Sequence, residues 1–383
     1  MNDLKEILLK EIPNFKEFSI KFFNGEVPKL EYKRFSGGYG VYAQRDQKSF
    51  MIRLRVSSGV ISRSQLHTIY HMASKHNLSH IHFTTRQAIQ LHGLDVDGVC
   101  DVMEEGIKNN IFTRGGGGNY PRNVGLSPLS GVDPNEAFDV TPYSVATDNH
   151  FISKITTYKL PRKLKVSYSS ADNDLAHCTV QDLGFVATIK DNEPYFKVFL
   201  GGGLGKNPAV ALELDELAKP HEVLYYVEAM TKMYMEHGDY NNHNRARVRY
   251  MVSNLGEEEF LRLFKEYVAN EKEKGGLDLY PQPIEYFESG VELNETNPRL
   301  FKQKQAGRYA VYIHPVGGIL SLKDLKSLLY ELDKFKNPMI RLSMSEGMYI
   351  LNLDGNEAKK LLDASKSISG DTTIEKSKWN WLT

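Results

Sequence analysis

The sequence predicts an α+β fold in which two similar units, each reading strand, helix, strand, strand, flank a different α+β segment. An internal repeat and its hydrophobic periodicities both predict this arrangement. SSGVISRSQL (57–66) aligns with VGGILSLKDL (316–325) at an offset of 259 positions. Without a gap, the same offset pairs IHF (81–83) with IRL (340–342). A register kept over this distance indicates two copies of one structural unit.

The elements of each copy follow from their side-chain patterns. FMIRLRV (50–56) alternates apolar and polar residues, as expected for a strand with one buried face. Ser62 and Gln65 then form a capping-box pattern ahead of a helical apolar stripe, and Ser321 and Asp324 occupy the matching positions in the second copy. We therefore expect two ferredoxin-like half-repeats that pair about a pseudo-twofold axis.

The segment between the copies has strand patterns near KLKVSYSS and PYFKVFL, and helical patterns near HEVLYYVEAMTKMYMEHG and EEEFLRLFKEYVANEKEKG. This succession predicts a separate α+β domain. The expected divisions are an N-terminal extension (1–35), a first half-domain with a glycine-rich loop (36–135), the α+β domain (136–285), a second half-domain (286–367) and a tail (368–383).

Charge balance, cysteine content and apolar runs indicate which partners and which cellular compartment to expect. The chain has 48 basic and 48 acidic residues, so no global field attracts nucleic acid or an anionic membrane. It has two cysteines, Cys100 and Cys178, which are too few for a disulfide framework or a cysteine-ligated cluster. Neither a signal peptide nor a run of about 18 apolar residues is evident. We expect a cytoplasmic protein.

The two copies differ in charge. Arg53, Arg55 and Arg86 of the first copy align with Tyr312, His314 and Ser345 of the second. The predicted scaffold is repeated, whereas its cationic surface is not. Solubilising arginines would be expected in both copies, so this asymmetry favours a local anion site.

Two further stretches place cations beside glycines or together on one strand face, as an anion site would require. TRGGGGNYPRNVG (113–125) places Arg114 and Arg122 around four glycines, whose amides can approach an anion closely. In LPRKLKVSY (160–168), Lys163 and Lys165 share one strand face, and their mutual repulsion favours an anion between them. A plain turn and a solvated, lysine-blunted edge strand are the alternatives.

These motifs together resemble one family. TTRQAIQLHG (84–93), TRGGGGNYPRNV (113–124), LPRKLKV (160–166), DLGFVATI (182–189) and GGGLGKNP (201–208) occur in the order found in the assimilatory sulfite and nitrite reductases. These enzymes carry sirohaem coupled to a [4Fe–4S] cluster. The resemblance covers roughly residues 35 to 365. It implies two ferredoxin-like half-units flanking a sirohaem-binding α+β domain, as the repeat also suggests.

The resemblance implies a set of site residues. The family's anion-binding quartet carries over to Arg86, Arg122, Lys163 and Lys165, which would neutralise the oxyanion and support proton delivery. Further residues are implied around the sirohaem: Arg53, Arg55, Thr85, Gln87, His92, Arg114, Gly116, Gly117, Asn119 and Asn123. We expect alanine at Arg86 or Lys163 to weaken sulfite binding and leave folding largely intact.

Substrate and partners follow from the same resemblance. Sulfite or nitrite is the expected substrate, with sulfite preferred because Lys165 is typical of the sulfite-type members, and ferredoxin or another electron donor is the expected partner. The family's four cluster cysteines have no counterparts in this sequence, so we expect a truncated or partial form that cannot ligate the cluster. A sirohaem-binding subunit completed by a second polypeptide is one alternative. RNA binding on a ferredoxin-like sheet is another, against which the balanced charge counts.

Overall fold

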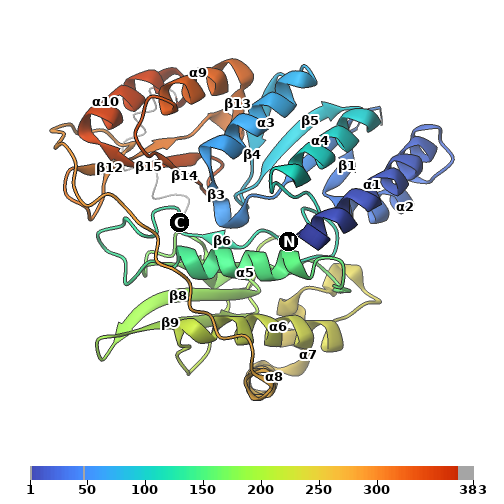
Figure 1. Cartoon of the computed structure of the whole chain (residues 1–383). Coiled ribbons are helices and arrows are strands. Elements are labelled where there is room, and N and C mark those ends of the chain that lie inside the picture. The colour runs from blue at the N-terminus through green and yellow to red at the C-terminus, as the bar shows by residue number, and fades with distance from the viewer. Residues whose placement is uncertain (1, 46–47, 370–383) are drawn as a thin grey trace.

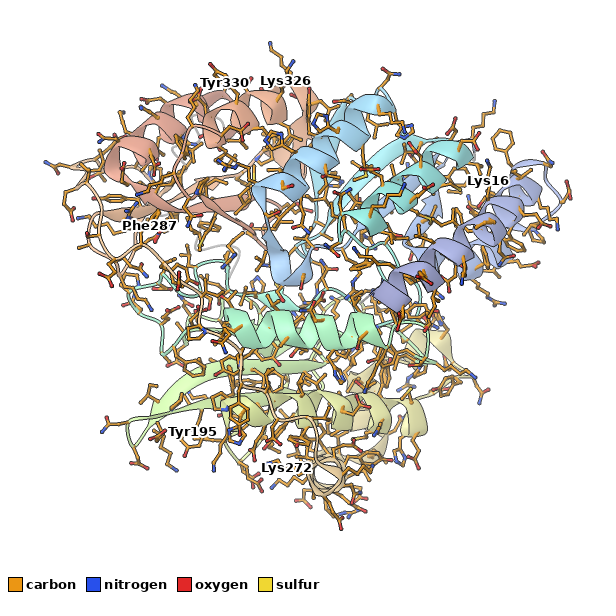
Figure 2. All side chains as sticks on the ribbon, in the orientation of Figure 1. Lys16, Tyr195, Lys272, Phe287, Lys326 and Tyr330 are labelled. Atoms are coloured by element: carbon orange, nitrogen blue, oxygen red, sulfur yellow. The ribbon has the colours of Figure 1, made fainter. Side chains whose placement is uncertain are left out.

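The computed structural model describes residues 2–45 and 48–369, and it confirms the predicted α+β class. Figure 1 shows two sheets and their covering helices above a central helix, α5 (Thr141–Ser153), with a third sheet and further helices beneath. Figure 2 shows side chains on both layers, with Lys326 and Tyr330 both on α9 (Leu322–Leu332) at the top of the view. In the part of the chain that is described, no helix combines the length and the apolarity needed to cross a membrane.

The first half-repeat follows two N-terminal helices. These elements are α1 (Asn2–Phe23), α2 (Lys29–Ser36), β1 (Val41–Ala43), β2 (Phe50–Leu54), β3 (Val60–Ile61), α3 (Arg63–Lys75), β4 (His80–Phe83), β5 (Ile89–Leu94) and α4 (Val96–Lys108). The second half-repeat has the corresponding series, which is β11 (Leu300–Lys302), β12 (Arg308–Ile313), β13 (Ile319–Ser321), α9 (Leu322–Leu332), β14 (Met339–Leu342), β15 (Met348–Asp354), α10 (Gly355–Ala364) and the short α11 (Lys366–Ser369).

The predicted repeat is present residue by residue. Strands β4 and β14 keep the sequence offset at both ends, and so do the 3-10 turns Ser57–Gly59 and Val316–Gly318. Even the backbone strain is repeated, because Gln87 and Glu346 both have positive φ, 52° and 61°. The capping box at Ser62 also forms, with Gln65 N donating to Ser62 Oγ over 3.1 Å.

The two half-repeats exchange a strand, which the sequence did not indicate. The sheets run β1-β2-β5-β4-β13 and β11-β12-β15-β14-β3, so β3 joins the second sheet and β13 joins the first. One continuous hydrophobic core therefore spans both halves. Neither half can complete its sheet alone, and the pseudo-twofold pairing is built into the backbone.

The TTRQ stretch (84–87) forms the turn between β4 and β5. It does not begin the alternating strand that follows it, because β5 starts at Ile89. The Thr84 hydroxyl accepts hydrogen bonds from the N–H groups of Arg86 (3.3 Å) and Ala88 (3.1 Å), which closes the turn. The turn projects Arg86 out of the sheet and toward the middle domain.

The middle domain has its own mixed sheet, in the order β10-β9-β8-β7-β6. Its elements are β6 (Gly125–Leu126), α5, β7 (Val166–Ser169), β8 (Leu183–Lys190), β9 (Glu193–Leu200), β10 (Leu212–Glu213), α6 (Val223–His237), α7 (Val248–Leu255) and α8 (Glu257–Lys274). Further 3-10 turns lie at Gly37–Tyr39, Cys178–Val180, Pro220–Glu222 and His243–Arg245.

Two parallel strands of this sheet position the candidate site. β6 and β7 pair in parallel, and the bridge between Pro121 and Leu164 continues that pairing ahead of both strands. Residues just before β6 and just before β7 must therefore lie at the same sheet edge. Arg122 precedes one strand, and Lys163 and Lys165 precede the other.

Candidate functional site

The four cations of the predicted quartet surround one cavity. It has a volume of about 200 Å³ and lies between the β4–β5 turn, β2, the glycine-rich loop and the segment before β7. Its lining residues are Arg53, Thr84, Thr85, Arg86, Ala88, Gly116, Arg122, Asn123, Lys163 and Lys165. Five of these ten are cations and none is acidic, so the cavity is suited to an anion.

Both cavity lysines lack partners. Within the described residues, neither ammonium group has a hydrogen-bond acceptor or a carboxylate in contact. Burial and then the charge of Arg122 lower the pKa of Lys163 to about 8. Burial, followed by the charges of Arg86 and Arg247, lowers the pKa of Lys165 to about 7. Lys165 is therefore poised to gain or lose a proton near neutral pH.

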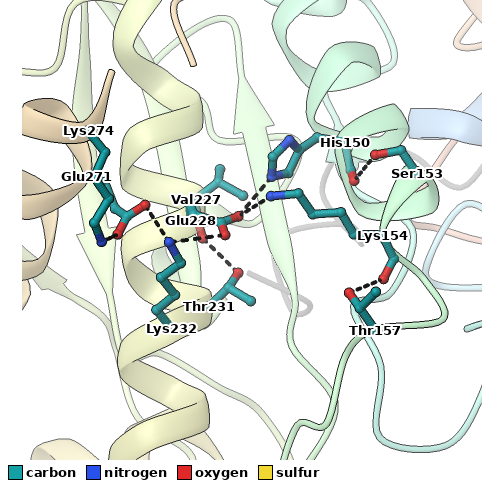
Figure 3. A network of polar contacts seen from close by, with 10 residues as sticks. All are labelled: His150, Ser153, Lys154, Thr157, Val227, Glu228, Thr231, Lys232, Glu271 and Lys274. Carbon is teal, nitrogen blue, oxygen red and sulfur yellow. Dashed lines mark hydrogen bonds and ion pairs between the residues drawn. The ribbon is translucent and has the colours of Figure 1, made fainter. Parts of the chain in front are cut away.

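Several lysines elsewhere in the middle domain are paired with carboxylates, unlike the two lysines of the cavity. Figure 3 shows the Glu228 carboxylate receiving His150 at 2.9 Å, Lys154 at 3.1 Å and Lys232 at 3.6 Å, between α5 and α6. Lys232 also contacts Glu271 on α8 at 2.7 Å. The lysines between these helices have carboxylate partners, whereas the lining of the cavity contains no carboxylate.

A buried ion pair lies beneath the cavity lysines. Arg247 binds Asp182 through two nitrogens, with contacts of 2.8 to 3.2 Å, and the Asp182 side chain is fully buried. Asp182 also accepts the backbone N–H of Lys165 at 2.8 Å. Because Arg247 neutralises this carboxylate, Asp182 holds the lysine backbone in place while the cavity stays positive.

Arg86 is held more firmly than the other cations. Its guanidinium donates to Val166 O at 2.6 Å, Asn123 O at 2.9 Å, and both Ser167 Oγ and Gln181 Oε1 at 3.1 Å. Burial lowers its pKa to about 10, so the group stays charged at neutral pH. Four of its five N–H groups are committed, and Arg86 thus joins the half-repeat to the middle domain. This differs from our expectation that alanine there would leave folding largely intact.

The glycine-rich loop serves the arginines rather than presenting free amides. Gly116 O accepts from Arg53 at 2.7 Å, and Gly118 O accepts from Arg122 at 2.8 Å. The N–H groups of Gly115, Gly116 and Gly118 are donated to protein acceptors. A Cβ at Gly116 would lie 2.9 Å from Thr113 O, so the close approach requires glycine. Burial lowers the pKa of Arg122 to about 10.

Two residues predicted to contact the cofactor, Arg55 and Arg114, lie outside the cavity and bind other parts of the protein. Arg55 is buried and binds Asp148 on α5 at 2.9 Å. Arg114 contacts Glu11 on α1 at 3.1 Å and lies between the rings of Tyr39 and Tyr120. Both guanidinium groups connect elements, and neither lines the cavity.

The remaining predicted residues divide between wall and scaffold. Thr85 and Asn123 line the cavity, and Asn123 also donates to Val56 O and Gln87 O. Gln87 is a buried clamp that donates to Leu126 O and Leu342 O. The other three lie outside the lining: Gly117 packs against Tyr42, Asn119 is half-buried, and His92 stands on β5 beside His80 and His82.

Sequence reasoning missed Thr84, Ala88, Asp182 and Arg247. Asp182 opens the DLGFVATI stretch, and a single carboxylate directly ahead of an apolar strand was an available signal. Arg247 lies in RARVRY (245–250), where three alternating arginines give no sign of which one faces inward. Its pairing with Asp182 emerges only in the folded chain.

The two cysteines lie in separate hydrophobic clusters. Cys100 belongs to the core shared by the half-repeats, and Cys178 is fully buried, with its thiol 3.3 Å from Phe185 O. Burial raises the pKa of both thiols. Within residues 2–45 and 48–369, no group of three or more His, Cys, Asp or Glu side chains is arranged to hold a metal ion.

Comparison with known families matches both parts of the fold. The family described as "Nitrite/Sulfite reductase ferredoxin-like half domain" matches residues 42–108 and 301–368. The family described as "Nitrite and sulphite reductase 4Fe-4S domain" matches residues 117–272. The fold and these matches define a protein with two ferredoxin-like half domains around a reductase-type domain. The chain belongs to the nitrite and sulfite reductase family.

Individual relatives include reductases of both substrate classes. The assimilatory ferredoxin-dependent nitrite reductase of Haloferax mediterranei is 27% identical over 85% of this chain and 58% of its own length. Sulfite reductase [ferredoxin] 1 of Mycolicibacterium paratuberculosis is 22% identical over 94% of this chain and 67% of its own length. The structure of the Mycobacterium tuberculosis NirA protein has the same fold, with a TM-score of 0.78, 22% identity, and coverage of 96% of this chain and 68% of that one.

The chain is shorter than these relatives. It spans 58% of the Haloferax mediterranei enzyme and 60% of the ferredoxin–nitrite reductase of Synechococcus elongatus. The activity, substrates and partners of the full-length relatives are therefore matters of proposal for this chain.

Proposed function

We propose that this chain forms the anion-binding part of a sirohaem-dependent reductase that acts on sulfite or nitrite. The observation that carries the proposal is the convergence of Arg86, Arg122, Lys163 and Lys165 on one cavity without any carboxylate in its lining. The volume of about 200 Å³ suits a small oxyanion, so the macrocycle itself would lie outside this cavity and meet only the residues at its rim. Ferredoxin or another donor would supply electrons, as the names of the relatives suggest.

The residues at the cavity fit an acidic cofactor. Sirohaem carries many carboxylates, and the cavity offers permanently charged arginines with no acidic competitor. We infer that Arg53 and Thr85, together with Arg122, would hold its periphery. When bound, sirohaem supplies the redox-active iron at which the oxyanion is reduced.

The protein side of the chemistry is charge and proton delivery. Arg122 and Lys163 would bind the oxyanion in its ground state. They are preorganised because Gly118 O holds the Arg122 guanidinium and because the pairing with Leu164 fixes the backbone at Arg122 and beside Lys163. Lys165, with a pKa near neutrality, would act as the proton donor when oxygen leaves as water. Arg86 would position the lysine segment through Val166 O.

Sulfite is the preferred substrate in this proposal, and nitrite is the alternative. The preference rests on Lys165, since a second lysine adds positive charge that a sulfite dianion uses more fully than a nitrite monoanion. The compartment proposed is a reducing cytoplasm, in line with two buried cysteines that are unpaired.

The test is co-expression of the chain with sirohaem biosynthesis, followed by a visible spectrum and an iron assay. A coloured protein whose spectrum changes on adding sulfite or nitrite, and changes less in Lys163→Met, supports the proposal. A colourless but folded protein would contradict it. A coloured protein whose spectrum changes with neither anion would favour the second candidate, a sirohaem-binding subunit without catalysis.

A further inference from the structure

A second cavity, of about 790 Å³, lies where the two half-repeats meet α5. It shares no lining residue with the cationic cavity. Figure 1 shows β3 and β14 directly above α5, with the chain that leaves α8 passing beside this helix on its way to β11. The strand exchange between half-repeats creates this junction, because β3 pairs with β14 there.

The walls of the cavity are mostly apolar. Val60 comes from the first half-repeat, Val145 and Ala146 from α5, Ile284 from the connection to β11, and Met339 from the second half-repeat. Walls contributed by four separate segments form a defined groove, and its volume falls in the range of small-molecule sites. An apolar body would be desolvated against these side chains.

One buried cation lines this apolar groove. Arg341 on β14 is only 3% exposed, and its Nε has no hydrogen-bond partner. Across the described ranges, its guanidinium makes no hydrogen bond and no ion pair. Arg55 and Arg247, which are comparably buried, are each paired with an aspartate. An unpaired buried charge is costly, so its persistence points to an absent partner.

The other cation that lines the groove, Arg63, already has protein partners. Arg63 donates to Leu332 O at 2.8 Å and lies 3.6 Å from Asp333. The groove therefore offers one uncompensated positive charge, and a guanidinium fork matches a carboxylate with two parallel hydrogen bonds. A phosphate dianion would keep an uncompensated negative charge among the apolar walls.

We propose that this groove binds a carboxylate with an apolar body, its carboxylate on Arg341 and its body against Val145 and Met339. This site is independent of the proposed reductase chemistry, because the two cavities have no residue in common. It gives the buried Arg341 charge a partner that the described part of the chain does not provide.

The test is isothermal titration of the full chain with decanoate, decanol and octyl phosphate. We expect saturable binding of one decanoate per chain, and at least tenfold weaker binding by decanol. Arg341→Met keeps the volume and removes the charge, so decanoate affinity should fall at least tenfold while decanol affinity stays within about twofold. Arg262→Met, an exposed arginine on α8, is the matched control and should leave decanoate affinity unchanged.

A second variant guards against a folding defect. Ala146→Phe fills the groove from α5 without touching the charge, and it should also abolish decanoate binding. Decanoate should raise the melting temperature of the parent and not that of either variant. The proposal is overturned if the parent shows no saturable decanoate binding, if Arg341→Met binds decanoate like the parent, or if octyl phosphate binds more tightly than decanoate.

Discussion

The two half-repeats share one backbone arrangement but carry different side chains at the positions that face the cationic cavity in the first half. Arg53 and Arg86 of the first half face the cationic cavity, whereas their counterparts in the second half are Tyr312 and Ser345. The Tyr312 hydroxyl lies 2.7 Å from Ser345 Oγ, and the Tyr312 ring stacks on Tyr349 at 4.4 Å. At these two positions the second half thus satisfies its polar groups locally, while the first half leaves positive charge facing an open volume.

This difference shows how a repeated scaffold acquires a site. The strained turn is kept in both halves, at Gln87 and Glu346, so the fold requires the turn itself. The residue before it is the variable position: Arg86 in one half reaches the middle domain, and Ser345 in the other bonds locally. Function is therefore carried by side chains that the repeated backbone presents.

The largest effect on stability is expected from substitution of Arg86. Arg86→Met removes the hydrogen bonds to Asn123, Val166, Ser167 and Gln181 and leaves their acceptors buried, which should lower the free energy of unfolding by ~3 kcal/mol or more. Ser345→Ala, its counterpart, should cost about 1 kcal/mol. Urea unfolding measures both, and equal losses in the two variants would contradict the asymmetry.

Removing the cavity lysines should affect binding rather than folding. Lys163→Met and Lys165→Met each remove an unpartnered charge, so stability should stay level or rise, while nitrite or sulfite affinity falls about tenfold or more. Tyr312→Phe in the second half serves as the control and should leave anion affinity unchanged. Titration calorimetry measures the affinities, and full anion affinity in both lysine variants would contradict the site.

The Glu228 network contrasts with the cavity lysines, because here a buried carboxylate has cationic partners. Burial alone would raise the pKa of Glu228, but His150 and Lys154 outweigh it and lower the pKa to about 2. This stabilisation is present above the ordinary value of 4.5 and is lost as pH falls toward 2. Glu228→Gln should cost about 1–3 kcal/mol at pH 7 and nothing near pH 2, as urea unfolding at several pH values would show. A penalty that did not change with pH would argue against the ion-pair assignment.

A smaller effect is expected from pH at the cavity. The pKa of Lys165 is about 7 in the folded chain, below its ordinary value of 10.5, so the unfolded chain binds more protons between these values. Stability without an anion should therefore rise with pH across that window. Nitrite remains a monoanion there, and its affinity should fall severalfold as pH rises through 7 to 8. Calorimetry in matched buffers measures nitrite affinity at each pH, and an affinity that did not change with pH would contradict a role for Lys165.

Much of this arrangement was predictable from short patterns, and some of it was not. The repeat, the capping box at Ser62 and the common face of Lys163 and Lys165 depend on local periodicity, which the sequence displays directly. The partners of Arg55 and Arg114 lie 93 and 103 positions away, and nothing in the local sequence marks Asp148 or Glu11 as partners. The strand exchange is equally non-local, because either strand would satisfy the same alternating pattern.

The central claim concerns two lysines and one anion, and it can be observed at the ammonium groups themselves. Reductive dimethylation with a ¹³C label keeps the lysines charged and makes each visible by NMR. On titration with nitrite, we expect the resonances of Lys163 and Lys165 to shift and the pKa of Lys165 to rise from about 7, while exposed lysines such as Lys326 do not respond. Unchanged resonances at both cavity lysines under saturating nitrite would contradict the account.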